Sequence, residues 1–434
     1  MSREMQHSGI EWIGEIPKEW RIGKVKNYYS LQTGFTPDTK NELYYDDENG
    51  WAWVNISDIG VDHYINNTKK KISQYYISKF NPTIVPKGSL LYSFKLSVGA
   101  VAIADIDLYT NEAIASFLQG EDINLNYLFY SSQVCIIYNA NENIYGAKLL
   151  NQELINNALI VFPPLSEQQK IANYLDKVCG EVDEMIALQE QMIEELKAYK
   201  QSVITEAVTK GLNPDVPMKD SGIDWIGEVP EGWKICRIKN VAALFGRIGF
   251  RGYTSDDLNK DGEGAITLSP SNMMPMCMDY SKVTYLSWKK YEESAEIMIQ
   301  NGDLLMVKTG SSYGKVSYVD KLPREATINP QILRIVPSIN SKYLGYYMQT
   351  DLFIYQVEGG VVGGTIPTIS QEKINNFYVI LPSDDEQQSI ASYLDTKCSE
   401  IDALIAIKQA KTDELKDYKK SVIYEYVTGK KEVV

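Results

Sequence analysis

Residues 167–176 (EQQKIANYLD) recur almost unchanged as residues 386–395 (EQQSIASYLD). Residues 195–204 (ELKAYKQSVI) recur at the same spacing as residues 414–423 (ELKDYKKSVI). Repetition at a fixed spacing indicates that one structural unit is used twice within a chain. The sequence therefore predicts two related halves.

A second pair of copies lies nearer the start of each half. Residues 8–17 (SGIEWIGEIP) recur as residues 221–230 (SGIDWIGEVP), at a slightly shorter spacing than the first pair. The difference in spacing must arise between the repeated blocks, where the two sequences diverge. The halves therefore share a frame and differ in their middles.

The C-terminal block of each half has the signature of a long helix. In the first half, Ser166 precedes an acidic and amide-rich first turn, and Gly211 and Pro214 close the segment. Apolar residues follow at spacings of three and four, which is typical of a coiled-coil seam. The predicted seam residues are Leu175, Val178, Val182, Met185, Met192 and Leu196 in the first half, and Leu394, Ile401, Leu404 and Leu415 in the second.

Each helix would run for about 40 residues, or roughly 60 Å, which is too long to bury against one small domain. The natural partner of each helix is the other one. The middles contain short β-rich stretches such as residues 90–94 and 304–308, bounded by Gly, Pro and Asn. We therefore expect an α+β fold in which two α/β globules are separated by two long helices that form an antiparallel coiled coil, with a pseudo-twofold internal repeat.

These expectations divide the chain into four segments. The first globule occupies residues 1–164 and the first helix residues 165–213. The second globule occupies residues 214–383, and the second helix with its tail residues 384–434. A chain of 434 residues is long enough for several domains, and its 44% apolar and 23% charged content is that of an ordinary globular protein.

The composition and the start of the chain predict a cytoplasmic protein. We find no apolar run near the roughly 20 residues that a spanning helix needs. Glu4 and Glu11 interrupt the region where a signal peptide would be apolar. The five cysteines lie far apart without a CxxC motif, so we expect free thiols.

The residue spacings of this chain do not match those of catalytic motifs. Residues 310–316 (GSSYGKV) resemble a phosphate-binding loop, but only three residues separate the glycines and Val316 follows the lysine. They are better explained as a glycine turn between two strands. The chain contains only two histidines, His7 and His63, and neither has a metal-ligand partner at a useful spacing. We therefore predict no catalytic, cofactor-binding or metal-binding residue. The function that we expect is binding of another molecule.

The net charge of −14, from 43 basic and 57 acidic residues, argues against a uniformly basic surface for nucleic acid. Any DNA contact must come from local clusters. Basic residues accompanied by tyrosines gather in the divergent middles, although each cluster could equally be ordinary solvated surface. The candidate DNA-binding residues are Lys69, Lys70, Lys71, Arg247, Arg251, Lys308 and Lys315.

With these repeated motifs, the chain resembles the specificity subunit of a type I restriction-modification system. The repeated openings, the repeated helix starts and the repeated ELKxYKxSVI helix ends occur in the expected order, and the resemblance covers nearly the whole chain. It implies that each globule is a target-recognition domain for one half of a bipartite DNA site. It also implies a non-catalytic subunit of a complex that cleaves DNA and methylates adenine at N6, as part of phage defence.

The resemblance also implies the partners. The helices would set the spacing between the half-sites and dock two modification subunits, which bind S-adenosylmethionine, while restriction subunits would use ATP and Mg. This chain would bind none of these cofactors itself, and no membrane is involved. Two alternatives stay open: a coiled-coil scaffold without DNA specificity, and the specificity part of a fused methyltransferase.

Overall fold

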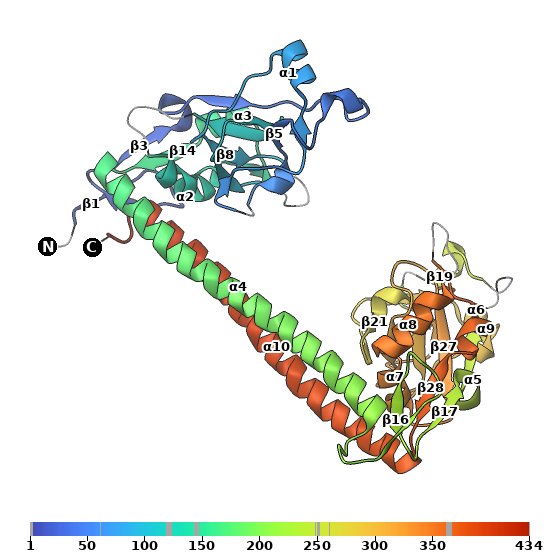
Figure 1. Ribbon diagram of the computed structural model, residues 1–434. Coiled ribbons are helices and arrows are strands. Elements are labelled where there is room, and N and C mark those ends of the chain that lie inside the picture. The colour runs from blue at the N-terminus through green and yellow to red at the C-terminus, as the bar shows by residue number, and fades with distance from the viewer. Residues whose placement is uncertain are drawn as a thin grey trace. The chain divides into compact units, whose positions relative to one another are not determined.

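The computed structural model describes residues 3–60, 62–118, 124–142, 146, 148–247, 249, 252–259, 261–361 and 367–433 (Figure 1). The chain forms two compact units, each a globular domain with parts of two long helices. Unit 1 comprises residues 1–190 and 410–434, and unit 2 comprises residues 191–409. The units therefore cut across the four predicted segments, because each takes a piece of both long helices.

The globular domain of unit 1 is built on a five-stranded sheet of order β4-β11-β8-β9-β6 and a three-stranded sheet of order β10-β5-β7. Its strands are β1 (Met5–His7), β2 (Glu15–Pro17), β3 (Arg21–Lys24), β4 (Leu31–Thr33), β5 (Trp51–Val54), β6 (Tyr64–Ile65), β7 (Lys71–Ile72), β8 (Leu90–Ser93), β9 (Val101–Ala104), β10 (Tyr109–Thr110), β11 (Ile114–Phe117), β12 (Asn141–Glu142), β13 (Lys148–Leu149) and β14 (Leu159–Phe162). Its short helices are α1 (Gln74–Phe80), α2 (Leu125–Cys135) and α3 (Gln152–Asn157). Strands β8, β9 and β11 are buried throughout, so this sheet is the centre of the domain.

The globular domain of unit 2 carries two four-stranded sheets, of order β18-β27-β24-β25 and β19-β23-β20-β26. Its strands are β15 (Met218–Asp220), β16 (Glu228–Pro230), β17 (Lys234–Arg237), β18 (Ala242–Gly246), β19 (Leu258–Asn259), β20 (Ala265–Leu268), β21 (Met273–Met274), β22 (Cys277–Met278), β23 (Thr284–Leu286), β24 (Leu304–Val307), β25 (Val316–Tyr318), β26 (Ala326–Ile328), β27 (Ile332–Pro337) and β28 (Tyr378–Leu381). Its short helices are α5 (Ile238–Val241), α6 (Trp288–Glu292), α7 (Ser341–Tyr347), α8 (Asp351–Gly360) and α9 (Gln371–Asn375).

Four strands of the divergent middles have the same topology in both units. Strands β4-β11-β8-β9 of unit 1 correspond to β18-β27-β24-β25 of unit 2, with antiparallel pairing between each neighbouring pair. Equivalent hydrogen bonds close the turn after the central strand, from Ser93 N to Ala100 O and from Val307 N to Lys315 O, both at 2.9 Å. The repeat therefore extends through the middles, although their sequences do not show it.

Each globular domain is held by the start of one long helix and the end of the other. The long helices are α4 (Leu165–Lys210) and α10 (Asp384–Val427). In unit 1, the hydroxyl of Tyr127 donates to the carbonyl oxygens of Val161 at 3.0 Å and Val427 at 3.2 Å. In unit 2, the hydroxyl of Tyr343 donates to those of Ile380 at 2.8 Å and Val208 at 3.3 Å. Both tyrosines are fully buried, and the bonds to Val427 and Val208 fix the C-terminal parts of α10 and α4 to the two domains.

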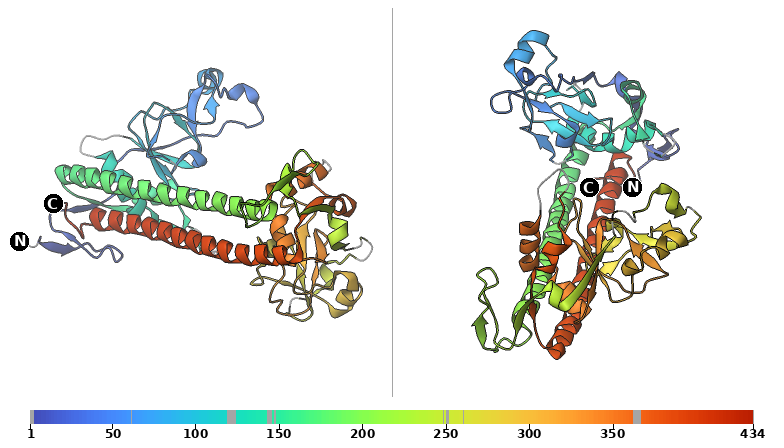
Figure 2. Two further views of the ribbon diagram at one scale, coloured as in Figure 1. Left: turned by 60° about the horizontal axis from the view of Figure 1, so that its bottom comes forward. Right: turned by 90° about the vertical axis from the view of Figure 1, so that its right-hand side faces the viewer.

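The two long helices pair antiparallel within each unit, as the views in Figure 2 also show. In unit 1, Tyr174 packs on Tyr426 with ring centroids 4.4 Å apart, and Lys419 pairs with Asp183 at 2.7 Å. In unit 2, an ion pair joins Lys200 to Asp402 at 2.7 Å. Gly211 follows α4 with φ +83°, a left-handed conformation that favours glycine and ends the helix.

The packed seam of the helices differs in phase from the predicted one. The buried or half-buried stripe follows spacings of four and three: Leu175, Cys179, Val182, Ile186, Gln189 and Ile193 on α4, and Leu394, Cys398, Ile401, Ile405, Lys408 and Thr412 on α10. Of the predicted seam residues, Leu175, Val182, Leu394, Ile401 and Leu415 are buried, while Val178, Met192 and Leu196 are half-buried.

Met185 and Leu404 were predicted to lie in the seam, and this prediction is wrong. Their side chains are 45% and 47% exposed. An apolar stripe beside the seam continues at the same three-and-four spacing, so the periodicity of the sequence fits either stripe. Packing selects the one that contains the smaller Cys179 and Cys398.

The α+β class, the paired long helices and the internal repeat are confirmed. Within the described residues, no helix combines the length and apolarity that crossing a membrane would require.

Candidate nucleic-acid interface

Three turns meet at one edge of the central sheet of unit 1. Strand β4 ends at this edge, the turn of residues 94–100 joins β8 to β9 there, and the turn at Asn111 leads into β11. The pairing of Thr33 with Ala115 and of Ser93 with Ile114 brings these strand ends together. Loops at a strand edge can change without disturbing the sheet, so this edge is a candidate binding surface.

Two of the predicted lysines reach a hollow beside this edge. Lys69 and Lys70 are exposed and line a hollow of about 590 Å³, together with Thr36, Tyr45, Asp58 and Asn111. The ammonium of Lys70 lies 5.2 Å from the ring centroid of Tyr45, a cation–π contact. The hollow thus combines positive charge with hydroxyl and amide groups.

Lys71 has a structural contact instead. Its ammonium donates to the carbonyl oxygen of Glu48 at 3.1 Å, and its backbone amide donates to the carboxylate of Asp47 at 3.0 Å. These bonds anchor the loop before β5 to strand β7. Of the three consecutive lysines, Lys69 and Lys70 are therefore the ones placed for an external phosphate.

The sequence did not single out Lys95, which lies on the turn between β8 and β9. Lys95 is exposed, and its neighbour Leu96 is 90% exposed with φ +58°. The pKa of the Glu112 carboxyl is lowered mainly by a hydrogen bond from the Thr36 hydroxyl. The positive charge of Lys95 contributes to this lowering. A lysine inside a predicted turn between two buried strands is the signal that could have identified it.

The equivalent edge of unit 2 carries Lys308 and Lys315. Burial lowers the pKa of the half-buried Lys308 ammonium. A Cβ built on Gly246 would lie 3.2 Å from this ammonium, so a glycine at the end of β18 leaves room for it. In the described part of the chain, no carboxylate pairs with Lys308. A half-buried cation without such a partner is a suitable site for an anionic group such as a phosphate.

Lys315 stands at the end of the same turn, and Asn329 and Gln331 precede β27 beside it. The amide nitrogen of Asn329 donates to the side-chain oxygen of Gln331 at 3.1 Å. Gln331 is exposed. Amides and lysines are the side chains that read base edges in the major groove, with Asn or Gln on adenine and Lys on guanine.

Arg247 was predicted to bind DNA, and the structure contradicts this. Its side chain is buried, with 6% of the residue exposed, and its guanidinium donates to the Ile328 carbonyl at 3.1 Å and the Thr327 hydroxyl at 3.0 Å. Burial lowers its pKa. Its hydrogen bonds tie the end of β18 to β26, so its role is structural. Arg251 lies outside the described residues.

Comparisons with known proteins identify the family of the chain. The family model described as the type I restriction modification DNA specificity domain matches residues 17–198 and 230–417, so it matches once in each half. The chain belongs to this family. Members of the family that it matches are specificity subunits, the non-catalytic DNA-recognition subunits of type I restriction-modification systems.

Two relatives come from Methanocaldococcus jannaschii. The chain is 24% identical to the type I restriction enzyme MjaIX specificity subunit, over 85% of this chain and 84% of that protein. It is 24% identical to the MjaVIII specificity subunit, over 96% and 93%. A solved structure from work on complex assembly and conformational transition of the type I R-M system superposes with a TM-score of 0.69 at 18% identity, over 95% of this chain and 98% of that one.

Proposed function

We propose that each globular domain of this specificity subunit reads one half of a bipartite DNA site through the sheet edge described above. The observation that carries the proposal is that equivalent edges present different side chains. By the equivalence of the two turns, Lys308 of unit 2 corresponds to the buried Phe94 of unit 1, and Lys315 corresponds to Ala100. One scaffold with different side chains at its edge is suited to reading two different sequences.

The repeated helices support a second part of the proposal, the docking of two modification subunits. Three pairs of apolar side chains are exposed at equivalent positions of α4 and α10. They are Met185 and Leu404 (45% and 47% exposed), Leu188 and Ile407 (51% and 63%), and Tyr199 and Tyr418 (56% and 53%). Exposed apolar residues gathered on one helix face mark an interaction site, and their recurrence favours two copies of the same partner.

The remaining parts of the proposal concern the complex. The modification subunits would bind S-adenosylmethionine and methylate adenine, and restriction subunits would bring ATP and Mg. This chain would contribute DNA specificity in the cytoplasm and bind none of these cofactors. Isothermal titration of the isolated chain with S-adenosylmethionine should show no binding, which separates this function from that of a fused methyltransferase.

The test of half-site reading is an exchange of one middle. Residues 31–117, from β4 to β11, would be replaced by the equivalent residues of a relative with a different target, leaving β3, α2, β14 and both long helices unchanged. Methylation mapping of the assembled complex should show one new half-site and one old half-site. The reciprocal exchange of residues 242–337 should change the other half. A change in both half-sites after either exchange, or in neither, would contradict the proposal.

A further inference from the structure

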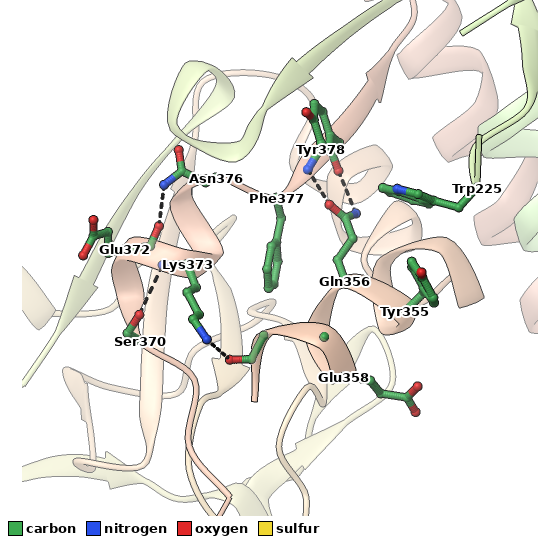
Figure 3. A pocket seen from close by; sticks show the side chains of 12 residues that line it. Trp225, Tyr355, Gln356, Glu358, Ser370, Glu372, Lys373, Asn376, Phe377 and Tyr378 are labelled. Atoms are coloured by element: carbon green, nitrogen blue, oxygen red, sulfur yellow. Dashed lines mark hydrogen bonds between the residues drawn. The ribbon is translucent and has the colours of Figure 1, made fainter. Parts of the chain in front are cut away.

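Unit 2 contains a pocket that lies outside the candidate DNA edge (Figure 3). It has a volume of about 690 Å³ and opens between the end of α8, helix α9 and the loop that carries Trp225. Its aromatic lining residues are Trp225, Tyr355, Phe377 and Tyr378. The pocket is large enough to admit a peptide side chain together with part of its backbone.

Three of these rings form a row. The ring centroid of Trp225 lies 5.5 Å from that of Tyr355 and 6.2 Å from that of Tyr378. The chain itself shows what such a row can bind, because the guanidinium of Arg237 lies 4.6 Å from the ring centroid of Tyr378. Arg237 also donates to the Tyr378 hydroxyl at 3.2 Å. Stacking on an aromatic face is a preferred contact of a guanidinium group.

The side of the pocket at Tyr355 favours positive charge. Tyr355 is 59% exposed, and Glu358 lies one helical turn further along α8, on the same face. Within the residues that the structure describes, the Glu358 carboxylate makes no ion pair or hydrogen bond. Lys373 also lines the pocket, and its ammonium is held at the C-terminal end of α8, where it donates to the carbonyl oxygen of Gly360 at 3.1 Å, as Figure 3 shows.

In the described part of unit 1, the corresponding tryptophan is covered by another ring. Trp12 occupies the position of Trp225 in the repeated block, and its ring stacks on Tyr138 with centroids 4.2 Å apart and planes 7° from parallel. Tyr138 therefore covers the face of Trp12, whereas the rings around Trp225 are tilted by 41° and 59°. The aromatic row at Trp225 is therefore not repeated at Trp12.

We infer that the pocket binds an arginine side chain of a partner polypeptide, with the guanidinium against Trp225 and Tyr355 and its charge facing Glu358. Because Tyr138 covers the face of Trp12, we assign one such site to each chain, at Trp225. A partner that uses it would therefore be recruited once per specificity subunit. Arginine binding at this pocket is independent of the proposed reading of DNA by the sheet edges.

The experiment uses the full chain labelled with 5-fluorotryptophan and observed by fluorine NMR. Replacing Trp225 or Trp12 with phenylalanine assigns their two resonances. The probe is the peptide acetyl-Gly-Arg-Gly-amide, and the matched probe carries citrulline, which has the same planar shape without the charge. We expect the arginine peptide to shift the Trp225 resonance in a saturable manner, to leave the Trp12 resonance unchanged, and to bind more tightly than the citrulline peptide.

A variant tests the carboxylate. Glu358→Gln should weaken binding of the arginine peptide by about threefold, the size expected for a partly exposed ion pair. Glu292→Gln, which removes an exposed carboxylate on α6, should leave the affinity unchanged. Equal binding of both peptides, an unshifted Trp225 resonance, or a shift of Trp12 as large as that of Trp225 would overturn the inference.

Discussion

The indole nitrogen of Trp20 donates a hydrogen bond to the carboxylate of Glu167 across 2.9 Å, joining the repeated opening of the first half to the start of α4. In unit 2, Trp233 makes the same bond to Glu386 at 3.0 Å. Both tryptophans are 2% exposed. The two repeated blocks of each half therefore recur together because they contact each other.

This contact predicts a dependence of stability on acid. Burial tends to raise the pKa of Glu386, but hydrogen bonds from Ser383 and Trp233 outweigh it, so the pKa of the folded protein lies below the ordinary value. A lowered pKa stabilises the fold above the pKa of the unfolded chain, and this stability is lost as the pH falls through the folded pKa. Glu386→Gln should flatten the pH dependence of unfolding below about pH 4.5, by less than about 1 kcal/mol because the residue is exposed. The measurement is urea unfolding at a series of pH values. If the free energy of unfolding of the variant depends on pH as that of the unchanged protein does, Glu386 does not have this role.

Arg247 should matter for stability. Arg247→Ala removes a buried guanidinium with charged hydrogen bonds to Ile328 and Thr327. We expect the free energy of unfolding to fall by about 2–3 kcal/mol. The measurement is urea unfolding followed by circular dichroism, with the exposed Lys289→Ala as a control that should change little. A variant of normal stability with weakened DNA binding would return Arg247 to the list of DNA contacts.

Lys308 should act on DNA affinity through phosphate. In the assembled complex, Lys308→Ala should weaken binding to all sequences alike and reduce the slope of log affinity against log salt by about 1. Lys239→Ala, on α5 next to the opposite end of β18, is the matched control and should leave the slope unchanged. A loss confined to one base pair of the site would instead assign Lys308 to base reading.

The exposed apolar stripe should determine how many modification subunits bind. Leu188→Glu should remove one modification subunit, Ile407→Glu should remove the other, and the double variant should bind neither. Ala187→Glu places the same charge on the opposite flank of α4 and should retain both subunits. Mass measurement of the purified complexes checks the stoichiometry, and two bound subunits in the double variant would exclude this surface.

Helix length should set the gap between the half-sites. Four residues inserted after Ala187 and after Ala406 would lengthen each helix by roughly 6 Å. DNA rises by about 3.4 Å per base pair, so the gap should grow by one or two base pairs. A coiled coil absorbs four extra residues by local unwinding. Methylation mapping should show unchanged half-sites with a longer gap, whereas an unchanged gap in an active complex would assign the spacing to the modification subunits.

The frame could be predicted from the sequence because its contacts join repeated blocks. The same Trp–Glu pair occurs in both halves, as Trp20 with Glu167 and as Trp233 with Glu386. The long helices can be predicted because their apolar residues recur at a local, regular spacing. The common topology of the middles could not be predicted. Strand pairing such as Ser93 with Ile114 and Val307 with Ile332 joins distant segments, and buried strands tolerate different apolar residues.

The errors at the level of single residues have a common cause. Met185 and Ile186 are both apolar and adjacent, so periodicity alone cannot decide which of them faces the other helix. Arg247 and Lys308 are both basic residues in turns, and only the folded sheet shows that the first is buried and the second half-buried. Burial depends on neighbours that are distant in sequence.

The closure of unit 1 by the end of α10 has a consequence for the order of folding during synthesis. The core of unit 1 joins Ile13 and Trp20 to Val422, Ile423 and Val427, which leave the ribosome after all of unit 2. Unit 2 is one continuous stretch of residues 191–409 and has all its residues available earlier. The domain that is synthesised first can therefore be completed only after unit 2 has been synthesised.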